Sequence, residues 1–438
     1  MKTNMQKYPD YKDSGVEWLG EIPNHWEIIR LKNIIRAKIT DGPHVTPEFI
    51  DEGIPFLSVD GIQNGELVFE NSRLISLNDH IKYQKKCRIE KFDILIGKAA
   101  SIGKIAQSKV DFEYSIWSPL ALIKPNLEKF NATFMEYYLK STLSQYQIEI
   151  LCTSNTQKNI SMDDIPKIIL TSPPLPEQTA IAAFLDRKTT LIDQAIGIKQ
   201  KQIELLKERR QILIHKAVTR GLNPNVKMKD SGVEWIGEIP EHWEVKRLKN
   251  ATKIFRGKFT HRPRNDERLY DGKYPFFQTG DVAKAGKYLF EYRQTLNDFG
   301  LRVSTLFPKG TIVITIAANI GDISILDVDA CFPDSIVGFK PMNFIERDFL
   351  YNSLLVMKEQ FMSSTIKNTQ MNLNVDRIGI NSIAVPSILE QKQIVEFIES
   401  ATIKIATAIS LKEQEIEKLK EYKATLINSA VTGKIKVC

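Results

Sequence analysis

The chain repeats itself: the segment KDSGVEWLGEIPNHWEIIRLKN at residues 12–33 recurs almost letter for letter as KDSGVEWIGEIPEHWEVKRLKN at residues 229–250. Further on, NTQKNISMDDI at 155–165 realigns with NTQMNLNVDRI at 368–378, and both copies share an Ala-Ala-x-Ile-Gly core. Between these anchors the residues diverge. A match this dense predicts two tandem copies of one module, in which a common scaffold carries two different recognition surfaces.

The divergent segments, residues 34–172 and 251–385, contain short β-rich runs. DILIGK, TIVITIA and IPFLSV are examples, and Gly, Asn, Asp and Pro separate such runs. Each divergent segment is therefore predicted to form an α+β domain. The predicted division of the chain is a first domain at 1–173, a central helix at 174–221, a second domain at 222–386 and a C-terminal helix at 387–438.

A long helical pattern follows each domain. Pro176 and Glu177 suit a first turn, because the missing proline N–H costs nothing there and a carboxylate meets the helix dipole. Gly221 and Gly433 supply the stops. A helix of about 40 residues would be roughly 60 Å long.

Each helix also has a seam of apolar residues on a seven-residue repeat, which needs a partner helix. The seam residues are Ile203, Leu206, Leu213 and Ala217 in the first helix and Ile416, Leu419, Leu426 and Ala430 in the second. We predict that the two helices pack together as an antiparallel coiled coil, with pseudo-twofold symmetry. The alternative is two independent helices, each packed on its own domain, but their equal lengths favour the pair.

The composition is that of an ordinary globular protein, with 42% hydrophobic residues. No apolar run approaches the ~18 to 20 residues that a membrane span needs, and the polar start does not resemble a signal peptide, so we expect a cytoplasmic protein. The four cysteines form no CxxC, which argues against a zinc ribbon or a disulfide framework. A net charge of +7 fits a nucleic-acid partner without requiring one.

Motifs for catalysis are missing from the sequence. It has no GxxxxGK[ST] phosphate loop, no GxGxxG turn after a strand, and no Asn/Asp-Pro-Pro-aromatic run for methylation of a base amino group. The six histidines form neither HxxxH nor HExxH, and His25 and His242, at equivalent places in the repeat, suggest packing. We therefore expect no catalytic residue and no metal site.

The quoted residues closely resemble the specificity subunit of type I restriction-modification enzymes. The resemblance covers nearly the whole chain and rests on the opening segment, present twice, and on the NTQxN segment that leads into PPLPEQ at 155–178. A weaker version of the latter ends in ILEQ at residue 391, where 385–389 (VPSIL) departs from the first copy. The resemblance implies two α+β target-recognition domains, two spacer helices and no enzymatic activity in this chain.

The resemblance also implies the partners. They are double-stranded DNA, two modification (methyltransferase) subunits and two restriction (translocase/nuclease) subunits, with no membrane involved. S-adenosylmethionine would bind to the modification subunits, ATP and Mg²⁺ would serve the restriction subunits, and this chain would bind no cofactor. The target would be asymmetric and bipartite, with one half-site for each domain.

Candidate DNA-binding residues are polar side chains in loops of the two domains, of the types that match base edges or phosphates. In the first domain they are Thr40, Asp41, His44, Thr46, Lys98, Ser101, Asn155, Gln157 and Lys158. In the second they are Arg256, Lys258, His261, Arg262, Arg264, Asn319, Asn368 and Gln370. The Asn and Gln residues of NTQxN recur in both copies, which favours a loop-holding or phosphate role over base contact. The Arg-rich loop at 256–266 (RGKFTHRPRND) is not shared, which favours DNA contact over a merely solvated surface.

Two other classes of function remain open from the residues alone. One is a scaffold protein whose domains bind peptides, against which the Arg-rich loop argues. The other is a self-sufficient methyltransferase or nuclease, against which the missing motifs argue.

Overall fold

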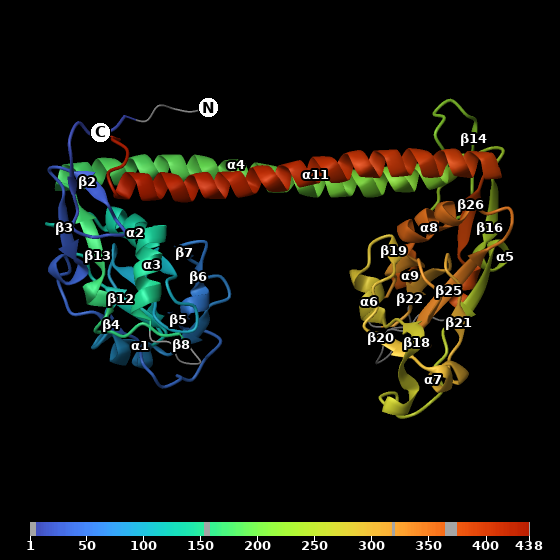
Figure 1. Ribbon diagram of the computed structural model, residues 1–438, viewed down its shortest axis with the longest axis horizontal. Helices are drawn as coiled ribbons and strands as arrows, with labels where there is room; N and C mark the ends of the chain where they lie inside the picture. The colour runs from blue at the N-terminus through green and yellow to red at the C-terminus, as the bar shows by residue number, and fades with distance from the viewer. Residues whose placement is uncertain (1–5, 153–157, 318–319, 364–374, 438) are drawn as a thin grey trace. The chain divides into compact units, whose positions relative to one another are not determined.

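The computed structural model describes most of the chain as two compact units (Figure 1). The described residues are 6–152, 158–317, 320–363 and 375–437. Unit 1 is drawn from residues 1–199 and 413–438, and unit 2 from residues 200–412. Both long helices cross this division, so each unit holds one part of each helix.

Unit 1 is built on a four-stranded and a three-stranded sheet. The four-stranded sheet has the order β10-β9-β12-β4, formed by β10 (Ile105–Gln107), β9 (Ile94–Gly97), β12 (Leu120–Ile123) and β4 (Thr40–Asp41). Strands β9 and β12 are buried along their whole length, as continuous apolar runs predict for strands covered on both faces. The three-stranded sheet is β11 (Ser115–Ile116), β5 (Ile54–Leu57) and β8 (Arg73–Ile75).

Short pairs of strands and three helices complete this part of unit 1. The pairs are β1 (Tyr11–Asp13) with β2 (Glu21–Pro23), β3 (Glu27–Arg30) with β13 (Ile169–Ser172), and β6 (Ile62–Gln63) with β7 (Glu66–Leu67). The helices are α1 (Leu77–Gln84), α2 (Ala132–Lys140) and α3 (Thr142–Leu151).

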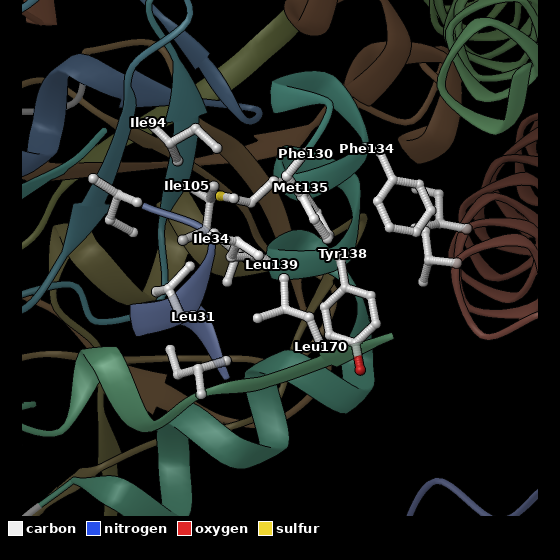
Figure 2. Packing of buried hydrophobic residues seen from close by; sticks show 14 of the residues in the cluster. Leu31, Ile34, Ile94, Ile105, Phe130, Phe134, Met135, Tyr138, Leu139 and Leu170 are labelled. Atoms are coloured by element: carbon white, nitrogen blue, oxygen red, sulfur yellow. The ribbon is translucent and has the colours of Figure 1, made fainter. Parts of the chain in front are cut away.

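The core of unit 1 lies between the four-stranded sheet and α2. The Asn131 side chain caps α2 by accepting a hydrogen bond from the Phe134 N–H, which fixes where the helix begins. Phe134 and Tyr138, one turn apart, then point from α2 into the core (Figure 2). Ile94 and Ile105 come from the sheet, and residues of the repeated opening segment join them.

Unit 2 repeats this plan with larger sheets. One is β17 (Thr252–Arg256), β25 (Ile336–Pro341), β22 (Ile312–Thr315), β23 (Ile323–Leu326) and β19 (Tyr288–Leu289), in that order. The other is β20 (Gln294–Leu296), β18 (Tyr270–Phe276), β24 (Ala330–Cys331) and β21 (Leu306–Phe307). The paired strands are β14 (Met228–Asp230) with β15 (Glu238–Pro240), and β16 (Glu244–Arg247) with β26 (Ser382–Val385). The helices are α5 (Leu248–Ala251), α6 (Thr279–Lys284), α7 (Asp298–Arg302), α8 (Arg347–Val356), α9 (Lys358–Ser363) and α10 (Val375–Ile380).

The predicted long helices are α4 (Leu175–Arg220) and α11 (Ile388–Val431), and they run antiparallel within each unit. In unit 1, Asp193 of α4 pairs with Lys423 of α11 at 2.6 Å, whereas Lys199, further along α4, pairs with Glu415, earlier in α11. In unit 2, Ile214, Ala217 and Val218 share a core cluster with Ile394, Val395 and Ile398. The antiparallel prediction is thus confirmed.

A buried glutamine ties the start of each long helix to its α+β domain. Gln178 accepts a hydrogen bond from the Asn131 N–H at 2.7 Å and donates to Pro173 O at 2.8 Å. Gln391 makes the equivalent bonds, from the Glu346 N–H at 2.7 Å and to Pro386 O at 2.9 Å. The glutamine therefore recurs in both copies for a structural reason, because it joins the long helix to the N-cap residue of a domain helix.

The repeated opening segment encloses the ends of both long helices. Gly433, which follows α11 with a φ of 72°, lies against Pro23 and the fully buried Trp26 of unit 1. Gly221 follows α4 with the same φ and lies against Trp243 and Glu390 in unit 2. Each opening segment thus holds the last turn of the helix that belongs to the other copy.

The two repeated histidines have a polar role in this arrangement, in addition to the packing expected of them. His25 Nε2 lies 2.9 Å from the Glu177 carboxylate, and His242 Nε2 lies 3.1 Å from that of Glu390. Both histidine side chains are at least half exposed. They contact the glutamate in the first turn of the following long helix.

Candidate nucleic-acid interface

The predicted recognition loops of the two domains begin at equivalent points of equivalent strands. Asp41 ends β4 and pairs with Ala121 of β12, and Arg256 ends β17 and pairs with Val337 of β25. In both units the partner strand lies next to the strand that precedes the Ala-Ala-x-Ile-Gly core. The register therefore places an acidic residue in one domain where the other has a basic residue.

A glycine that cannot be replaced without a clash follows each of these residues. A Cβ atom on Gly42 would stand 1.8 Å from Ile116 O, and one on Gly257 would stand 2.0 Å from Pro333 O. In each case the chain passes directly over the segment that leads into the central strand. Glycine is needed here for close approach of two backbones, and this approach sets the direction in which the loop leaves the sheet.

At the start of the first loop, Asp41 is buried and surrounded by basic side chains. Lys86 Nζ lies 2.5 Å, Lys98 Nζ 3.1 Å and His44 Nε2 3.1 Å from its carboxylate oxygens. Burial raises the pKa of Asp41, but hydrogen bonds and charge attraction from Lys86 and Lys98 outweigh burial, so its pKa is lowered. The carboxylate is thus ionised and engaged within the domain, while the His44 side chain remains 69% exposed.

The other described candidates of the first domain are more scattered. Thr46 is exposed in the same loop as His44, and Thr40 is half-buried on β4. Ser101 lies in the turn between β9 and β10, and Lys158 is exposed and pairs with Glu149 at 2.8 Å. Asn155 and Gln157 lie outside the described residues.

In the second loop, arginines are anchored to the segment beside it. Arg256 Nε donates to Asp334 O at 2.8 Å, and Arg264 pairs with the Asp334 carboxylate at 2.6 Å. Arg262 donates to two carbonyl oxygens of its own loop. Lys258 is exposed. The loop is therefore held in one shape, with guanidinium groups at its surface.

A second carboxylate, Asp266, organises the far end of this loop. Hydrogen bonds from Arg268 and from His261, the latter at 2.8 Å, hold the pKa of Asp266 well below its usual range. His261 is a candidate from the sequence, whereas Asp266 and Asp334 are not. Asp266 ends the Arg-rich loop in the sequence and could have been found there, but Asp334 is brought to the loop only by the fold. Asn319, Asn368 and Gln370 lie outside the described residues.

The eight seam residues lie on the two long helices as follows. Leu426 and Ala430 are buried in the core of unit 1, and Leu419 packs against that core half-buried. Ala217 is buried in a core cluster of unit 2, and Leu213 packs against it. The remaining three are Ile203 and Ile416, which are buried, and Leu206, which is half-buried.

Two further findings concern metals and membranes. Among the described residues, no group of three or more His, Cys, Asp or Glu side chains could hold a metal ion. In the same part of the chain, none of the helices combines the length and the apolar character that crossing a membrane requires.

Known proteins show the same organisation. The model of the type I restriction modification DNA specificity domain matches residues 23–208 and 240–421. The chain is 27% identical over 437 residues to the type I restriction enzyme MjaVIII specificity subunit of Methanocaldococcus jannaschii, covering 95% of this chain and 94% of that protein.

Two solved structures share the fold. One, from work on complex assembly and conformational transition of the type I R-M system, has a TM-score of 0.74 at 16% identity and covers 94% of this chain and 99% of that chain. The other is the HsdS subunit from Thermoanaerobacter tengcongensis, with a TM-score of 0.56 at 16% identity, covering 94% and 98%. The family model accounts for most of the sequence in two matches, one for each copy of the repeat. The chain belongs to the type I restriction-modification DNA specificity family and is a non-catalytic specificity subunit with two tandem recognition domains.

Proposed function

We propose that the two loops that follow Gly42 and Gly257 carry the DNA-contacting residues of this specificity subunit, one loop for each half-site of an asymmetric target. The observation that carries this proposal is the equivalence of the two loops. They leave the same strand of the same fold, yet one begins at Asp41 and the other at Arg256. Surfaces that share a position but differ in charge suit the reading of two different short sequences.

The geometry supports different roles for the candidate residues. His44 and Thr46, exposed in the first loop, and Arg262 and Lys258, exposed in the second, are proposed to reach base edges or phosphates. Asp41 is proposed to act through Lys98 and His44, because its carboxylate is already engaged. The other candidates are proposed as supporting contacts, namely Thr40, Lys98, Ser101, Asn155, Gln157, Lys158, Arg256, His261, Arg264, Asn319, Asn368 and Gln370.

The proposal also assigns a role to each segment of the chain. Residues 1–173 and 222–386 are the target-recognition domains, and residues 174–221 and 387–438 are the spacer helices. Two modification subunits and two restriction subunits would assemble on this chain in the cytoplasm. S-adenosylmethionine would be bound by the former, and ATP with Mg²⁺ by the latter, since members of this family carry no catalytic cofactor themselves.

Exchange of one domain tests the proposal. Replacing residues 34–172 with the corresponding segment of another specificity subunit should change one half of the methylated sequence and leave the other half intact, because the second loop is untouched. Single-molecule sequencing of methylated DNA from cells that express the chain with its modification subunits measures both halves. A change in both halves, or in neither, would show that the domains do not read separately.

A further inference from the structure

Beside the recognition loop, each domain has a second polar surface on its smaller sheet. In unit 1, Phe56 of β5 pairs with Arg73 of β8, and in unit 2, Phe276 of β18 pairs with Gln294 of β20. On the other side, both phenylalanines pair with a parallel strand, β11 or β24. Arg73 and Gln294 therefore occupy the same position of the same three-stranded arrangement.

In unit 1 this position opens onto a groove of ≈ 270 Å³, which Arg73 and Trp117 both line. The Arg73 guanidinium lies 5.0 Å from the ring centre of Phe49 and 5.7 Å from that of Trp117. Such cation–π contacts hold a guanidinium in place without using its N–H groups. In the described part of the chain, the Arg73 side chain is exposed and no hydrogen bond or ion pair to it is found, although the carboxylates of Asp60 and Glu70 also line the groove.

The equivalent groove of unit 2 has a volume of ≈ 500 Å³ and adjoins the Arg-rich loop. Arg264 of that loop and Arg293 line it together with Gln278 and Gln294. Gln278 Nε2 donates to Gln294 Oε1 at 3.4 Å, so the two amides face each other. This groove therefore presents amide and guanidinium groups beside the loop proposed to contact DNA, and the carboxylates of Glu267 and Asp271 also line it.

The aromatic rings beneath the two positions are also alike. Phe56 packs with Phe49 and Trp117 in unit 1, with ring centres 6.3 and 6.2 Å apart, and Phe276 packs with Phe259 at 5.1 Å in unit 2. Phe259 belongs to the recognition loop itself. A packed aromatic layer therefore supports both the loop and the polar residue on the edge strand. Because these groups are already ordered before binding, they lose less conformational entropy when DNA binds.

We propose that Arg73 and Gln294 are specificity-determining residues, Arg73 for a guanine in the half-site of the first domain and Gln294 for an adenine in the half-site of the second. Arginine forms two parallel hydrogen bonds to guanine O6 and N7, and glutamine does so to adenine N6 and N7. The inference rests on the proposed function, because it needs both domains to contact DNA on the face that carries the loops.

The test uses the full chain assembled with its modification subunits and a pool of duplexes with randomised half-sites. Arg73→Gln should lower the preference for one guanine by about 10- to 100-fold in one half-site, with the other half-site unchanged. Gln294→Arg should do the same for one adenine in the other half-site. Arg88→Gln and Asn343→Arg are matched controls, since both residues are exposed and lie outside the two grooves.

A third variant separates base reading from phosphate contact. Arg73→Lys keeps the charge over the rings but lacks the planar fork, so it should lose the guanine preference while retaining most of the affinity for the pool. Retention of the guanine preference by Arg73→Lys and Arg73→Gln would overturn the inference. If the domain exchange still changed one half-site, the proposed function would hold even though this inference had failed. If the wild-type complex selected no sequence at all, both the proposed function and this inference would be wrong.

Discussion

Gly257→Ala should abolish recognition of the half-site that belongs to the second domain. The added Cβ would lie 2.0 Å from Pro333 O and 2.6 Å from Phe332 O, which are backbone atoms that cannot rotate away. The loop must therefore shift, and with it the guanidinium groups of Arg262 and Arg264. Since each lost base contact costs about 1–3 kcal/mol, loss of several contacts should weaken specific binding by about 100-fold or more.

Equilibrium binding to the full target and to duplexes with one altered half-site measures this effect. Gly280→Ala is the control in the same unit, because nothing lies within 4 Å of its added Cβ and Gly280 is exposed in α6. Gly42→Ala should cause the same loss of recognition at the other half-site, since its Cβ would lie 1.8 Å from Ile116 O. If Gly257→Ala bound the full target as tightly as Gly280→Ala, the loop would not be the reading element.

The second large effect is expected where the opening segment holds the ends of the long helices. Trp243 is fully buried and packs in the core cluster of unit 2 that includes residues of both α4 and α11. Its Nε1 donates to Glu390 at 3.1 Å. Trp243→Ala should lower the free energy of unfolding by about 3–5 kcal/mol, as removal of a large buried side chain does. Trp26→Ala should cost a similar amount in unit 1, where Trp26 is equally buried.

Phenylalanine at the same positions distinguishes packing from hydrogen bonding. Among the described residues, the buried Trp26 Nε1 has no hydrogen-bond acceptor, and Tyr8 donates to Glu177 Oε1, the oxygen equivalent to the one that Trp243 bonds on Glu390. Trp243→Phe should therefore cost about 1–2 kcal/mol more than Trp26→Phe, since only Trp243 loses a bond to a carboxylate. Urea unfolding followed by far-ultraviolet circular dichroism measures both variants. Equal losses would mean that the Trp243–Glu390 bond contributes nothing.

The helices could be predicted because their signals are local. Pro176 and Glu177 lie in the first turn of α4, and Gly221 and Gly433 take the left-handed φ that the C-terminal stop of a helix requires. The seam spacing indicated the antiparallel partner, since each position has a counterpart in the other copy. The internal duplication predicted that both units share one plan, although the strands and helices added to that plan differ between them.

The recognition surfaces could be predicted only as far as their loops. Lys86, which helps to neutralise Asp41, comes from a separate segment after α1, and Asp334, which anchors Arg256, is distant in the chain. Neither contact leaves a spacing pattern in the sequence. Arg73 and Gln294 are equivalent only through strand register, which a comparison of two diverged sequences does not contain.

Each opening segment holds the last turn of the long helix from the other copy, and this has a consequence for synthesis on the ribosome. Unit 2 is one continuous stretch of chain, whereas unit 1 includes Leu426 and Ala430, which are made last. The half that is translated first is thus completed after the half that follows it. Until the final turns of α11 emerge, the indole of Trp26 and the apolar residues around it are not packed against that helix. A nascent or truncated chain therefore exposes an aggregation-prone apolar surface that is buried in the finished protein.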